Sequence, residues 1–203
     1  MFHSDDLIAM ALAYYFLNEG QLLNPPMTAG ILLSFAAVAL LSHSDYRRKD
    51  TTPEGGHPLA LYGWIAGYSV IWGVAIFCTR LMALENIGAS TFIAGWYSGA
   101  LLAALVILQL KPGARTAITA RDAILSVGLG CVILTALGLN YWALAVAPLL
   151  IVQPLFLVSE MVLPALIGLF GFGEKKDYGS AEWCYLGAGA LGATLVITGF
   201  VAG

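Results

Sequence analysis

The chain has 203 residues, of which 60% are hydrophobic and only 10% are charged, whereas about 25% are charged in an ordinary soluble domain. This composition excludes a soluble globular protein and indicates an integral membrane protein. The formal net charge is -3 and the basic residues are dispersed among short loops, so no nucleic-acid partner is expected.

Long apolar blocks separated by short polar joints predict transmembrane helices. Most blocks approach the roughly 20 residues that cross a bilayer, and none alternates with the period of a barrel strand. We therefore expect an all-α fold, a polytopic helical bundle of about seven segments in a lipid bilayer. In chain order the blocks are residues 7–17, 27–41, 59–82, 88–110, 123–146, 149–172 and 183–201.

The first block is too short to span. Its 11 residues cover about half of a hydrocarbon core of roughly 30 Å. Asp5 and Asp6 stand where the rest of a span would be. Two interpretations stay open: a short re-entrant or interfacial segment, or a transmembrane helix whose beginning is absent.

The basic residues predict an orientation. Eight of the nine Lys and Arg residues fall in the joints 43–58, 111–121 and 173–182, which share one side of the membrane if the blocks alternate. The positive-inside rule makes that side cytoplasmic, with the N-terminus inside and the C-terminus outside.

No cofactor or metal site is predicted. The three cysteines lie far apart within apolar blocks, and the three histidines lie in terminal or loop positions. A haem, a zinc site or a buried Ser-His pair would need closer spacing or a histidine within a helix. An enzyme is therefore not expected.

Glu160 is an acid in the middle of the apolar block 149–172. A carboxylate removed from water costs several kcal/mol or more unless it is paired or neutralised. One interpretation is a buried acid held by hydrogen bonds from neighbouring helices. The other is a group that lines a solute cavity and binds a proton or a cationic group. Gln153, Glu160 and Pro164 fall near one helix face, as a polar stripe along a cavity would.

Weaker candidates lie in other blocks. Asn140 fits either the lining of a cavity or a hydrogen bond between two helices. Trp72, Trp96 and Tyr97 fit the aromatic walls of a site for an organic solute, or ordinary packing between helices.

Three charged residues stand near the ends of blocks. Arg80 is expected to extend to the interface or to pair with Glu85. Glu19 lies at a helix end, where solvation by a loop would explain it.

A weak internal repeat aligns Glu19 with Glu174, each followed by a small-residue helix. Asp5 and Glu160 then lie 14 residues before these two acids. The alignment predicts that residues 1–42 are the last two helices of one repeat, followed by the polar loop 43–58.

The segments 68–107 and 139–174 resemble the EamA repeat of the drug/metabolite transporter superfamily. The resemblance covers residues 59–203 as one whole five-helix repeat and the first two blocks as the tail of another. The features that carry it are Trp72-Gly73, Arg80, Tyr141-x-Ala143 and Gly173-Glu174.

This resemblance implies inverted repeats with ten helices in all, of which this chain lacks about three. It implies alternating access around a central cavity and transport of small organic solutes or metabolites. Glu160 adds the expectation of coupling to protons or to exchange, because protonation of its carboxylate and binding of a solute would be mutually exclusive. It also implies cytoplasmic termini, which would place Arg47 to Lys49 outside, against the charge pattern. The expected location is the plasma membrane, of the bacterial inner-membrane type.

One alternative is a non-transporting membrane subunit, or an inactive fragment, that packs with partner helices. A second copy of the chain is also open as a partner, because the glycine faces of the helices permit a dimer without requiring one.

Overall fold

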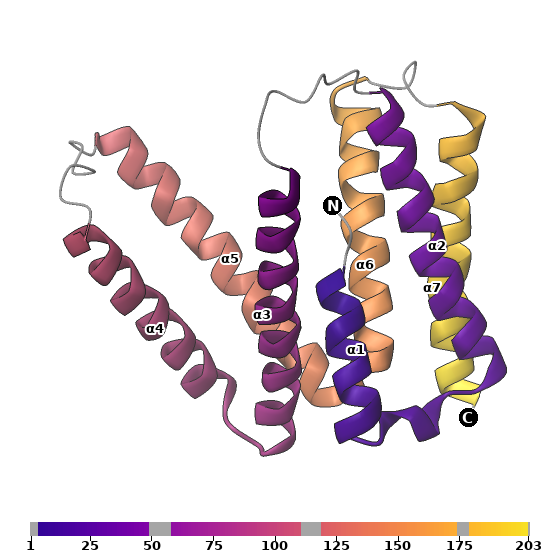
Figure 1. Cartoon of the computed structure of the whole chain (residues 1–203), viewed down its shortest axis with the longest axis horizontal. Helices are drawn as coiled ribbons and strands as arrows, with labels where there is room; N and C mark the ends of the chain where they lie inside the picture. Colours follow the sequence, from indigo (N-terminus) through magenta and orange to yellow (C-terminus); the bar gives the residue numbers. More distant parts are fainter. Residues whose placement is uncertain (1–3, 49–57, 111–118, 174–178, 203) are drawn as a thin grey trace. The chain divides into compact units, whose positions relative to one another are not determined.

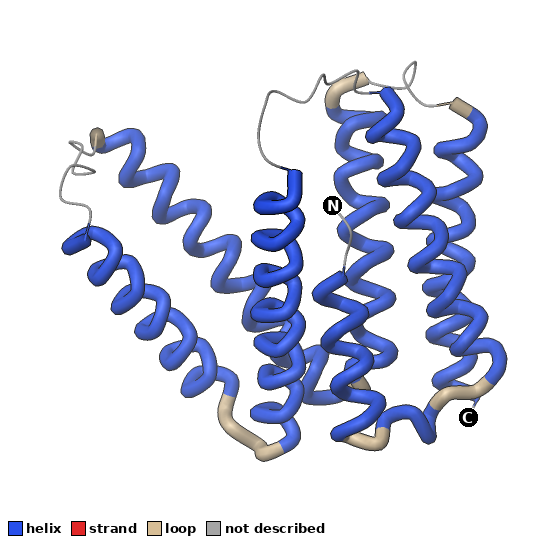
Figure 2. Tube along the Cα trace, in the orientation of Figure 1, coloured by secondary structure: helices blue, strands red, loops and turns tan. Residues whose placement is uncertain are grey.

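The structure is a computed structural model that describes residues 4–48, 58–110, 119–173 and 179–202. The described residues form helices and no strands, which confirms the all-α prediction (Figure 2). Each predicted block corresponds to one helix. In chain order the elements are α1 (Ser4–Phe16), the 3₁₀ turn η1 (Glu19–Leu22), α2 (Pro25–Arg48), α3 (Pro58–Leu84), α4 (Ala89–Leu110), α5 (Ala120–Val146), α6 (Leu149–Leu166), the π-helical turn η3 (Ile167–Gly171) and α7 (Ser180–Ala202).

Within the described part of the chain, six helices, α2 to α7, are long and apolar enough to cross a membrane. The chain is therefore an integral membrane protein. α1 has 13 residues, or about 20 Å at the rise of an α-helix, which is less than the hydrocarbon thickness. The first block is thus a helix shorter than a span.

The helices divide into two compact units. Unit 1 comprises Met1–Phe77 and Ala147–Gly203, and unit 2 comprises Cys78–Val146. Unit 1 contains α1, α2, most of α3, α6 and α7, and unit 2 contains the hairpin of α4 and α5 (Figure 1). In unit 1, α2 ends at the same end as α7 begins, which agrees with the alternation used to predict the orientation.

α2 and α7 run antiparallel and pack through small residues. A Cβ built on Gly30 of α2 would lie 2.6 Å from the carbonyl oxygen of Gly192 in α7, and one on Gly192 would lie 2.5 Å from Ser34 Oγ. Such distances show that the two backbones are in near contact, as small residues allow in membrane helices. At the other end of α2, the hydroxyl of Ser44 donates to the carboxylate of Glu182.

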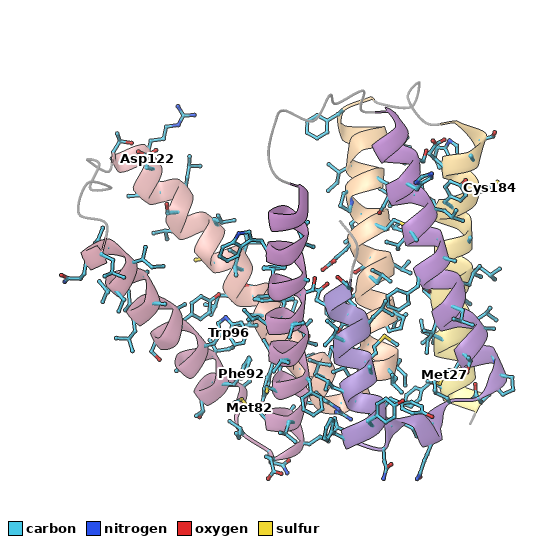
Figure 3. The ribbon with its side chains drawn as sticks, viewed as in Figure 1. Met27, Met82, Phe92, Trp96, Asp122 and Cys184 are labelled. Atoms are coloured by element: carbon cyan, nitrogen blue, oxygen red, sulfur yellow. The ribbon has the colours of Figure 1, made fainter. Side chains whose placement is uncertain are left out.

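The start of α2 is joined to the end of α7 by Asn24. Its Oδ1 accepts from the backbone N–H of Met27 at 2.9 Å, which caps the helix. Its Nδ2 donates to the carbonyl oxygen of Gly199 at 2.7 Å. Figure 3 shows Met27 where α2 begins beside α7. One amide side chain thus fixes both the start of α2 and its register against α7.

α6 is the central helix of unit 1. Leu157, Met161 and Ala165 on one face pack with Val38 of α2 and Leu186 of α7. Pro154 and Pro164 lie inside the helix, and a π-helical turn continues it to Gly171. Proline removes a backbone donor from a helix. The regular α-helix nevertheless continues through Glu160 to Leu166, and the π-helical turn begins at Ile167.

Candidate functional site

Glu160 lies near the middle of the candidate span that contains α6. That span, Leu149–Gly171, has 23 residues, or about 34 Å, and Glu160 is about 16 Å from its start. Its side chain is exposed on the surface of the chain. Both interpretations of this acid, a structural hydrogen-bonded residue and a group that lines a solute cavity, stay predictions.

Gln153, two turns before Glu160 on α6, is buried and paired with α1. Its Nε2 donates to the carboxylate of Asp6, and the two side chains are 6% and 5% exposed. Its Oε1 is buried and has no hydrogen-bond partner among the described residues. The predicted polar face is therefore divided: α1 covers Gln153, whereas Glu160 and Pro164 are exposed.

Glu19 caps the start of α6 from the turn η1. Its side chain is 6% exposed, and its Oε2 accepts from the backbone N–H of Leu150 at 3.2 Å. A carboxylate is favourable at this position because the first N–H groups of a helix have no partner within it and carry partial positive charge. The expectation that loop solvation explains Glu19 was therefore wrong, whereas Glu174 lies outside the described residues.

Unit 2 contains an aromatic cluster between α4 and α5. The ring of Phe92 stacks on that of Tyr141, with centroids 4.5 Å apart, and lies 5.7 Å from the ring of Trp96. Figure 3 shows Phe92 and Trp96 on neighbouring turns of α4. The hydroxyl of Tyr141 donates to the carbonyl oxygen of Ile87. Trp96 therefore takes part in a packed wall between two helices.

Two predicted site residues in unit 2 hold polar atoms that are buried and have no partner among the described side chains. These atoms are the hydroxyl of Tyr97 and Oδ1 of Asn140. Buried polar atoms in native proteins are nearly always hydrogen-bonded, so each unsatisfied one suits a further hydrogen-bond partner, such as a solute or a water. Asn140 directly precedes Tyr141 of the aromatic cluster.

Trp72 belongs to unit 1. It stacks on Tyr68 of the same helix, with centroids 6.1 Å apart and planes 7° from parallel, and it is 41% exposed. The six predicted site residues thus divide between the units: Trp72, Gln153 and Glu160 lie in unit 1, and Trp96, Tyr97 and Asn140 lie in unit 2. Their roles in binding stay predictions.

The structure buries three charged residues that were not expected in the interior. The expectation that Arg80 extends to the interface was wrong, because its side chain is 7% exposed. Its Nη1 donates to the carbonyl oxygen of Leu144 in the last turn of α5, where a cation complements the helix dipole. Asp6 and Glu182 are also buried. The sequence did contain one indication for Asp6, because this acid directly precedes an apolar block that is too short to span a membrane.

Comparisons with models of known protein families, with curated proteins and with solved structures give no match. The resemblance to the EamA repeat therefore stays a prediction from the motifs.

Proposed function

We propose that the chain is a membrane transporter of small organic solutes or metabolites, similar to members of the EamA-repeat family, in a bacterial-type inner membrane. It works by alternating access, with transport coupled to protons or to exchange. The observation that carries the proposal is the position of Glu160, an exposed acid near the middle of a membrane-spanning helix.

An acid at this depth favours transport for an energetic reason. A charged side chain at the centre of a bilayer costs about 2.5 to 3.5 kcal/mol or more, and such residues usually face a cavity or an ion pathway. Glu160 is the group that binds either a proton or the cationic part of a solute. Because the two compete for one carboxylate, each transport cycle exchanges one for the other.

The other predicted residues are candidate binding groups within each unit taken by itself. Gln153 and Asn140 offer an amide oxygen with no described partner, which suits a donor on a solute. In unit 1 Trp72, and in unit 2 Trp96 and Tyr97, offer aromatic surface that suits the apolar part of a solute.

Transport is tested with the purified protein in liposomes on a solid-supported membrane. Amino acids, nucleosides and organic amines are perfused one class at a time, with and without a proton gradient, and the charge moved is recorded. We expect a current with at least one class. In Glu160→Gln the dependence on the proton gradient should be lost. Glu85→Gln, at an exposed acid after the end of α3, should keep it.

Two results would count against the proposal. Unchanged proton coupling in Glu160→Gln would remove this residue from the coupling role. No current with any class, from protein that keeps its helical circular dichroism, would favour the second candidate function.

That candidate is a non-transporting membrane subunit. It is favoured by α5, in which every residue from 120 to 136 is exposed. Such a surface is suited to packing against lipid or against the helices of a partner.

A further inference from the structure

We draw no further inference here: the strongest candidate, the buried side-chain cluster in which Gln153 of α6 donates to the carboxylate of Asp6 of α1 and holds an amide oxygen with no hydrogen-bond partner among the described residues, carries nothing new because it belongs to the candidate site already described.

Discussion

Gly30→Ala should destabilise the contact between α2 and α7. The added Cβ would lie 2.6 Å from the carbonyl oxygen of Gly192 and 2.7 Å from the backbone nitrogen of Val196. Both are backbone atoms of a helix, so neither can rotate away as a side chain does. An ordinary Cβ contact begins at 3.4 Å, so the two helices must separate locally by about 0.8 Å, the difference from 2.6 Å.

The loss of unfolding free energy in Gly30→Ala can be estimated from this local separation of the two helices. A radial gap of 0.5 to 1 Å forfeits about a quarter to a half of the dispersion energy of the atoms that lose contact. Extra methyl groups in well-packed cores cost about 1 to 3 kcal/mol. The preference of helices for Ala over Gly offsets part of this cost, by up to about 1 kcal/mol. The control must therefore be another Gly→Ala substitution within a helix, so that the gain in helix propensity cancels between the two variants.

Gly187→Ala is that control, since Gly187 lies on α7 and has no atom within 4 Å of its built Cβ. Both variants are unfolded by titration with SDS in mixed micelles, followed by circular dichroism. We expect the free energy of unfolding of Gly30→Ala to be about 1 to 3 kcal/mol below that of Gly187→Ala. Equal values would refute the close approach of α2 and α7 at Gly30.

Two further predictions concern α1 and α6. Gly73→Ala, whose Cβ would lie 2.7 Å from the carbonyl oxygen of Asp5, should displace α1 from α3, whereas Gly67→Ala has open space. In a background without native cysteines, a thiol at Ala13→Cys should then be labelled about tenfold faster, and an unchanged rate would contradict the contact. Glu19→Ala removes the acceptor for Leu150 N–H and should lower the SDS unfolding energy by about 1 to 2 kcal/mol. Glu85→Ala, at an exposed acid, should change it by less than about 0.5 kcal/mol, so equal effects of these two variants would argue against the cap.

The positions of the helices could be predicted from the sequence because the membrane imposes one requirement on every span. A span needs a long apolar run, and a polar joint must end it. The predicted block 123–146 and the helix Ala120–Val146 differ only because Thr119 and Asp122 cap the start of that helix through mutual hydrogen bonds. Short polar caps extend helices beyond their apolar residues, so the ends were predicted less well than the middles.

The contacts between helices could not be predicted in the same way. Hydropathy does not say which of two adjacent acids points inward, and the structure buries Asp6 but leaves Asp5 half-buried. Nor does it indicate that Glu19 reaches α6, 131 residues further along the chain. Both acids were visible in the sequence, but Glu19 accepts from a backbone N–H group, which every helix possesses. Asp6 accepts from the side chain of Gln153, 147 residues away.

Gln153 and Glu160 show how far helical periodicity can be used. Their spacing of seven residues places them on one face of an α-helix. They differ in burial, because Gln153 pairs with Asp6 of α1 and is buried, whereas Glu160 is exposed. A wheel projection gives the direction of each side chain but not how far a neighbouring helix extends along that face. Burial along one face of a helix therefore has to come from the structure and not from the period of the sequence.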